Sequence, residues 1–159
     1  MMTFGIHTIL TDQMIHPATL GPALEERGFG ALFLAEHSHI PVHTTTEHAA
    51  TGGEVPPIYR RVLDPFVALG VVASVTGKLL LGTGTSLPIQ RDPIQTAKVA
   101  QLARAGSGLP VIANGVRPEP ALVAAYREAG AGGINFHLPA LRTDDALRRL
   151  DEFAALLSS

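Results

Sequence analysis

Residues 23–42 read ALEERGFGALFLAEHSHIPV, and this stretch holds the pattern that decides the fold. A helical segment ends at Gly28, and an apolar run typical of a β-strand follows over Ala31–Glu36. The run stops at the polar pair Glu36-His37, where a long histidine-rich loop begins. Apolar residues on consecutive positions are typical of strands that are covered on both faces. The stretch therefore predicts a helix-to-strand unit of an α/β protein, with polar residues at the strand end.

The same alternation of strand and helix runs through the rest of the chain. Five β-type runs are expected, at Phe4–Leu10, Ala31–Glu36, Leu79–Thr85, Pro110–Asn114 and Gly133–Leu138. Helices are expected near Ala18–Arg27, over Pro65–Val75, from Asp92 to about Ala105, from Pro118 to Ala129, and after Thr143 as the cap of the last helix. This order predicts a mainly parallel sheet of five βα units.

The length of the chain limits which α/β fold it can form. With 159 residues, the chain is expected to be a single α/β domain, 1–159. A closed (β/α)8 barrel takes about 250 residues, and five βα units are too few for one. The pattern alone therefore favours a small doubly wound sheet.

Composition excludes several classes of protein. Hydrophobic residues make up 46% and charged residues 16%, as in a globular protein. A net charge of −2 without a basic block argues against nucleic acid as a partner. The absence of cysteine excludes disulfides, iron–sulfur clusters and thiol catalysis. No apolar run approaches the roughly 20 residues that span a bilayer, and the N-terminus lacks a secretory signal, so we expect a cytoplasmic protein without a membrane partner.

Polar residues and glycines gather at the ends of the predicted strands, where parallel α/β proteins bind ligands. His37 has an ordinary pKa near neutrality and could exchange a proton there, or Glu36-His37 could be a structural pair that caps the loop. Arg117 could hold an anionic group at the start of the next helix, or be a solvated arginine. The other candidates at strand ends are His7, Gly82, Gly84, Asn114 and His137. For them the alternatives are core packing or an ordinary strand end.

The loop after Glu36 carries four of the seven histidines of the chain: His37, His39, His43 and His48. Their spacing contains no HExxH motif, and no cysteine is present to complete a zinc site, so no metal ligand is assigned. A loop of about 25 residues in a compact domain is usually functional. We therefore expect it to form the mouth of a cofactor or substrate site.

Four segments of the chain carry a resemblance to a known family. They are FGIHTILTD (4–12), ALEERGFGALFLAEHSHIPV (23–42), LDPFVALGVVASVTGKLLLGTGTSLPIQRDPIQTAKVA (63–100) and VIANGVRPEPALVAAYREAGAGGINFHLPALRTDDALRRLDEFAALL (111–157). Together they resemble the luciferase-like monooxygenase family, and within it the F420-dependent oxidoreductases. Residues 1–105 resemble the N-terminal βα units of that family, and residues 110–159 resemble its last two. The long middle section of the family is missing between them.

The resemblance implies a truncated TIM barrel, in which the five strands lie in the order fourth, fifth, first, second, third. It also implies that coenzyme F420, or alternatively FMN, binds at the carboxyl ends of the strands. Glu36 and His37 would be the catalytic residues. The cofactor-binding residues would be His7, Gly82, Gly84, Thr85, Asn114, Arg117 and His137. The family carries a non-proline cis peptide at the end of the third strand, and the matching bond here is Gly84–Thr85.

Three hypotheses about function follow. The first is a flavin- or F420-dependent oxidoreductase that transfers a hydride between deazaflavin and a small organic substrate. This protein would form a homodimer or larger homo-oligomer, because the missing strands leave the edges of the sheet open. The second is a non-catalytic remnant or scaffold of the same family. The third is a metal-binding hydrolase that uses the loop histidines.

Overall fold

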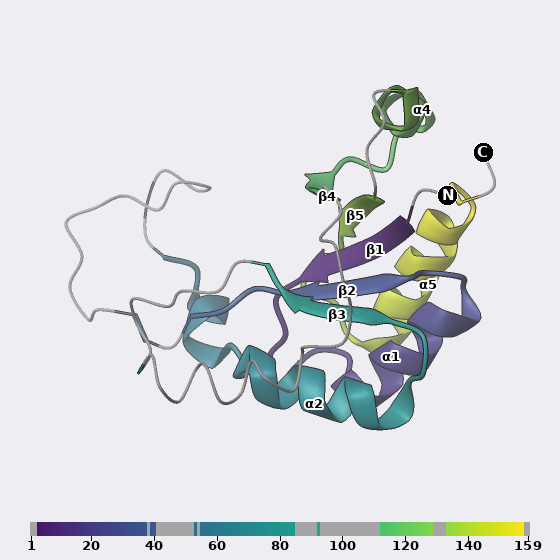
Figure 1. Ribbon diagram of the computed structural model, residues 1–159. Coiled ribbons are helices and arrows are strands. Elements are labelled where there is room, and N and C mark those ends of the chain that lie inside the picture. Colours follow the sequence, from purple (N-terminus) through teal and green to yellow (C-terminus); the bar gives the residue numbers. More distant parts are fainter. Residues whose placement is uncertain are drawn as a thin grey trace.

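The computed structural model describes residues 3–37, 39–40, 53, 55–84, 92, 112–128 and 133–157 (Figure 1). Three features expected from the sequence lie outside these residues. They are the helix predicted to follow Asp92, the residue Thr85 with its preceding peptide bond, and the loop histidines His43 and His48.

The described chain alternates strand and helix, as the sequence predicts. The strands are β1 (Thr3–Thr8), β2 (Ala31–Leu34), β3 (Leu80–Thr83), β4 (Ile112–Val116) and β5 (Gly133–His137). The helices are α1 (Pro17–Glu26), α2 (Pro65–Val75), α4 (Pro120–Glu128) and α5 (Thr143–Ala154), with a short 3-10 helix, η1 (Pro57–Arg61), before α2. The helix η1 was not predicted, since it lies within the segment expected to be loop.

Local capping explains why the boundaries of these helices could be predicted from the sequence. The carboxylate of Asp64 accepts hydrogen bonds from the N–H groups of Phe66 and Val67 at 2.9 and 3.1 Å, so α2 begins at Pro65 as predicted. Gly28 follows α1 with a φ of 79°, which glycine adopts without strain.

The expected cap of the last helix is wrong by one residue. Thr143 is the first helical residue of α5, and the capping position is held by Arg142, whose side chain makes no capping hydrogen bond. The backbone of Arg142 is extended, so the chain turns into the helix only at the next residue. Asp144 and Asp145 make the first turn of α5 acidic.

The sheet is parallel, and its order is β3-β2-β1-β5-β4. This order confirms the expected arrangement, in which the C-terminal strands return to lie beside the first strand. The pairing of β1 with β5 joins Thr3–His7 to Gly133–His137 residue by residue. Segments more than 120 residues apart in sequence therefore form the centre of the sheet.

One face of the sheet carries the apolar core. Even-numbered residues of the central strands, Ile6, Leu32, Leu34, Ile134 and Phe136, are buried in one cluster with side chains of all four helices. In Figure 1, α1, α2 and α5 lie beneath the sheet, and α4 lies beyond β4. A doubly wound sheet has helices on both faces. The described helices instead cover one face, as in part of a (β/α)8 barrel, so the alternative favoured by pattern alone is not the fold.

The opposite face is closed near the start of the strands and accessible near their carboxyl ends. Gly5, Ala31 and Asn135 share one row across the sheet and are buried. One row further along, His7 and Phe33 are half-buried and His137 is exposed. The carboxyl end of this face is therefore where a ligand can reach the sheet.

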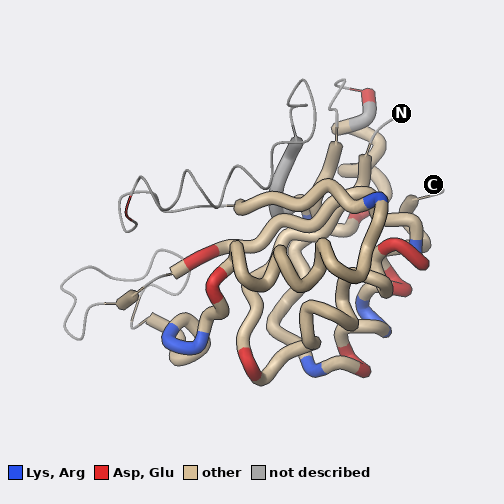
Figure 2. The backbone as a smooth tube through the Cα atoms, turned by 60° about the horizontal axis from the view of Figure 1, so that its bottom comes forward, with Lys and Arg blue, Asp and Glu red and all other residues tan. Residues whose placement is uncertain are grey.

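The charged residues of the described chain lie mainly on α5, on η1 and in the turns, and Pro65–Val75 of α2 has none (Figure 2). Within the described residues, no helix combines the length and apolar character that crossing a membrane requires.

Candidate functional site at the carboxyl end of the sheet

Three ring-bearing side chains lie side by side on neighbouring strands. His7 of β1 is the direct partner of His137 in β5 and of Phe33 in β2. Directly paired residues of parallel strands point to the same face of a sheet. The rings of His7 and His137 are 5.9 Å apart between centroids, tilted by 46°. We call His137, His7 and Phe33 the ring row.

His7 fixes the end of β3. Its Nε2 atom is hydrogen-bonded to the carbonyl oxygen of Gly84, which lies two strands away. A carbonyl can only accept, so Nε2 must carry the proton, and in the neutral ring Nδ1 is then an acceptor. The N–H group of Gly84 donates to the carbonyl of Leu34 at 2.9 Å. The chain at Gly84 is therefore held by hydrogen bonds to both β1 and β2.

Gly82 of β3 and Gly84, the residue after its end, lie against the ring row. A Cβ atom on Gly82 would be 2.7 Å from Cε1 of Phe33, closer than real side chains approach. A Cβ atom on Gly84 would be 3.1 Å from Cβ of Phe33 and 3.4 Å from Cδ2 of His7. Close approach, and not an unusual φ, is therefore the reason for glycine here.

Electrostatics favour the neutral form of His137. Partial burial lowers the pKa of His137 below its ordinary value, and a positive charge on the neighbouring His7 would lower it further. A hydrogen bond with the backbone of His7 acts in the opposite direction but is the smallest of the three effects. At neutral pH, His137 is therefore an uncharged imidazole that can donate from one nitrogen and accept at the other.

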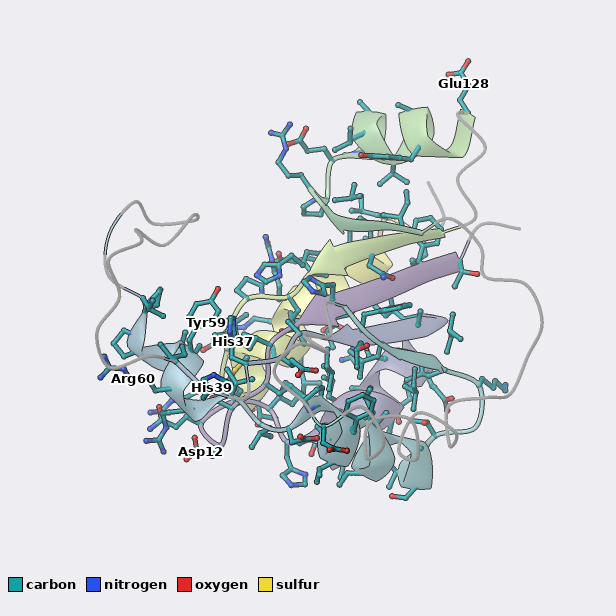
Figure 3. The ribbon with its side chains drawn as sticks, turned by 60° about the vertical axis from the view of Figure 1, so that its left-hand side comes forward. Asp12, His37, His39, Tyr59, Arg60 and Glu128 are labelled. Carbon is teal, nitrogen blue, oxygen red and sulfur yellow. The ribbon has the colours of Figure 1, made fainter. Side chains whose placement is uncertain are left out.

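Glu36 and His37 have different surroundings. The carboxylate of Glu36 is buried, with 3% of the residue exposed. His37 is half-buried, and its ring meets that of Tyr59 edge-on at 4.7 Å between centroids (Figure 3). Sequence reasoning missed Tyr59, because this contact joins the two ends of a long loop and leaves no local signal.

The helix η1, which carries Tyr59, is anchored to the end of β1. Arg61 makes two hydrogen bonds to the carboxylate of Asp12, one of them at 2.8 Å from Nε to Oδ1. Thr11 and Val62 form an antiparallel bridge, and the N–H group of Leu63 donates to Leu10 at 2.8 Å. The Arg61 guanidinium also holds the pKa of Asp12 below its usual value. These contacts hold Tyr59 at the carboxyl end of the sheet.

Asn114 and Arg117 lie apart from the ring row. The fourth strand was predicted to end at Asn114, but β4 continues to Val116. Asn114 pairs with Asn135, which lies two residues before His137 of the ring row. An irregularity between Asn114 and Val116 shifts the register there. Arg117 is exposed and forms an ion pair with Glu119 at 3.0 Å.

The residues around Gly84 fit the flat ring that the sequence led us to expect. Phe33 supplies an apolar ring surface, and the absent side chains of Gly82 and Gly84 make room for the Phe33 and His7 rings against the chain there. His7 and His137 supply polar groups at the same level of the sheet. Among the described residues, no three histidine, aspartate or glutamate side chains are placed to hold a metal ion.

Comparisons with known proteins agree with this geometry. A family model described as luciferase-like monooxygenase matches residues 18–158. Proteins described as uncharacterized from Mycobacterium bovis and from two strains of Mycobacterium tuberculosis are 38% identical to the chain over 99 residues. The match covers 61% of this chain but 35% of each relative, so the chain corresponds to about a third of the relatives' length.

Proposed function

Because the chain belongs to the luciferase-like monooxygenase family, we propose that the ring row is the cofactor-ring site of a flavin- or F420-dependent oxidoreductase. The observation that supports this proposal is the convergence of His137, His7 and Phe33 with Gly82 and Gly84 at the carboxyl end of parallel strands. Barrels of this kind bind their ligands at that end. F420 is proposed in preference to FMN on the resemblance of the segments quoted above.

Each side chain of the proposed site has a distinct task. His7 holds the Gly84 carbonyl through Nε2, so it positions the end of β3, and in the neutral ring its Nδ1 is a hydrogen-bond acceptor. His137 is a neutral hydrogen-bonding group beside it. His37, placed by Tyr59, is the proposed group that exchanges a proton with a small organic substrate. Glu36 is buried behind the start of the same loop and is proposed to support His37.

The cofactor itself would supply the hydride donor or acceptor. The protein contributes orientation, a surface that excludes water from the ring, and a proton donor or acceptor at His37. These tasks need only the carboxyl ends of β1, β2, β3 and β5, which the described chain provides.

The described residues offer few groups that could bind the phosphate-bearing tail of the cofactor. Arg117 was the candidate for an anionic group, but its guanidinium is paired with Glu119 and exposed to solvent. The chain also matches only 35% of the length of its relatives. These two observations favour weak cofactor binding, and they give support to a second candidate, a non-catalytic scaffold that keeps the fold of the family.

Titration with F420 and with FMN, followed by difference absorbance, tests the proposal. Binding that saturates, and that weakens in His7→Ala, is the expected result. Binding of neither cofactor at millimolar concentration would favour the scaffold. Retention of a cofactor through purification would contradict the expectation of weak binding.

Metal analysis of protein purified without a histidine tag tests the remaining hypothesis. We expect no stoichiometric zinc, since the described histidines do not gather into a three-ligand site. One equivalent of bound metal would revive the metal-binding hydrolase.

A further inference from the structure

We propose that Phe33 is a cofactor-binding residue, whose aromatic ring forms the surface on which the flat cofactor ring packs. The inference rests on the proposed function and extends it, since neither the sequence motifs nor the resemblance assigns a role to Phe33. It is carried by the register of the sheet, the burial of the neighbouring rows and the close contacts of Gly82.

Register places Phe33 in the middle of the site. It pairs with His7 on one side and with Gly82 on the other. The row therefore runs His137, His7, Phe33, Gly82 across four adjacent strands. Ala31, two residues earlier on the same face, is fully buried, whereas Phe33 is half-buried. Phe33 is therefore the first large apolar side chain on β2 that a ligand at the carboxyl end would meet.

The glycines of β3 determine how the Phe33 ring lies. The position that a Cβ on Gly82 would take is 2.7 Å from Cε1, 3.0 Å from Cδ1 and 3.4 Å from Cζ of Phe33. One whole edge of the ring therefore occupies the space that a side chain at residue 82 would need. The ring leans over the backbone of β3, and this position depends on glycine at residue 82.

This arrangement provides the combination of groups that a fused heteroaromatic ring needs. The Phe33 ring offers a face for offset stacking, which strengthens aromatic contacts beyond simple burial of area. His7 and His137 offer hydrogen-bonding nitrogens beside that face. Phe33 has no polar group of its own, so its role in the proposal is stacking, with no part in proton transfer.

The test compares the wild-type protein with three variants, using FMN and F420 separately as probes. Phe33→Leu removes the ring but keeps an apolar side chain. Gly82→Ala keeps the ring but displaces it, because the new Cβ would clash with it. Gly70→Ala is the matched glycine control, since a Cβ at residue 70 meets nothing within 4 Å. Thermal unfolding of each variant establishes that it is folded before titration.

We expect Phe33→Leu and Gly82→Ala to weaken binding roughly two- to tenfold, the range of one lost aromatic contact, and Gly70→Ala to bind as the wild type does. The absorption spectrum of saturated FMN provides a second readout. Stacking on an aromatic ring shifts the flavin absorption bands, so the bands of bound FMN should differ between Phe33→Leu and the wild type.

The outcomes separate this inference from the proposed function. Wild-type protein that binds neither probe overturns the proposed function, and the role of Phe33 with it. Wild-type protein that binds FMN or F420, with unchanged affinity and an unchanged absorption spectrum of bound FMN in Phe33→Leu, overturns the role of Phe33 alone.

Discussion

At the scale of single residues, the two histidines of the ring row differ in what they do. His7 uses its Nε2 proton to hold Gly84, whereas His137 is kept neutral by partial burial and by the proximity of His7. Both were singled out from the sequence because they end predicted strands. Their hydrogen-bond partners and their proximity could not be read from the sequence, since these depend on how β1 pairs with β5.

Replacing His7 should change the titration of His137. His7→Gln keeps an N–H donor for Gly84 but cannot carry a positive charge, so the pKa of His137 should rise part of the way toward its ordinary value. Burial, which is the larger cause of the lowered pKa of His137, remains in this variant. NMR titration of the His137 ring protons measures this, with His39→Gln as the control. An unchanged His137 pKa would show that the charge of His7 does not affect the titration of His137.

At the scale of secondary-structure elements, one carboxylate joins α1 to the turn between α2 and β3. Oε1 of Glu25 accepts hydrogen bonds from the N–H groups of Gly77 and Leu79 at 2.9 and 3.1 Å, and from that of Lys78 at 2.5 Å. These bonds lower the pKa of Glu25. The turn leads directly into β3, so this contact helps to set where Gly82 and Gly84 lie.

Glu25→Ala should lower the thermal midpoint at pH 7, and Glu25→Gln should lower it less, because one amide oxygen still accepts. The folded pKa of Glu25 is below its unfolded value of about 4.3. Its stabilisation is therefore fully present above that unfolded value and is lost as pH falls through the folded pKa. The gap between wild type and Glu25→Ala should accordingly shrink in melts at pH 3.

The control for this comparison is Glu26→Ala, at the neighbouring exposed position of α1. We expect it to leave the thermal midpoint nearly unchanged at both pH values. A Glu25→Ala midpoint that falls equally at pH 7 and pH 3 would show that the charge of the carboxylate does not matter.

At the scale of the whole molecule, the fold depends on joining the two ends of the chain. Phe136 of β5 is fully buried, and its ring lies 5.3 Å from that of Phe153 in α5 and 6.1 Å from that of Phe4 in β1, between centroids. This aromatic cluster packs the C-terminal βα unit against the first strand. The ring row lies on the opposite face of the central strands β5, β1 and β2.

Phe136→Ala should therefore destabilise the protein by about 3–5 kcal/mol, the usual range for removing a buried aromatic ring. Urea unfolding measures this. Val67→Ala is the control, since Val67 is 69% exposed and its truncation should change stability by no more than about 0.5 kcal/mol. Equal midpoints for the two variants would mean that β5 does not fold cooperatively with β1.

The edges of the sheet support the prediction of a homo-oligomer. In the described sheet, β3 and β4 are the edge strands, and unpaired strand edges favour pairing with another chain. Light scattering should give a mass of at least twice the 16.7 kDa of one chain. A stable 16.7 kDa species across a wide concentration range would refute this prediction.

The strands and helices could be located from the sequence, because caps, prolines and runs of apolar residues act within a few positions of the chain. Asp64-Pro65 began α2, and Gly28 ended α1, as local chemistry requires. The sequence also carried the resemblance from which the strand order was expected. The end of β4 and the cap of α5 were misplaced, because both depend on contacts with neighbouring segments.

Which of the candidate residues meet depends on the pairing of distant segments in the folded chain. Register across β5, β1, β2 and β3 put His137, His7, Phe33 and Gly82 into one row. The pairing of β4 with β5 put Asn114 beside Asn135, in another row of the sheet. Phe33 had no signal in the sequence, since an apolar residue inside an apolar strand looks like core. Its proposed role follows from the face it occupies and from the missing side chain of Gly82, its direct partner on the neighbouring strand. Pairing between distant segments sets these relations, and no local pattern encodes them.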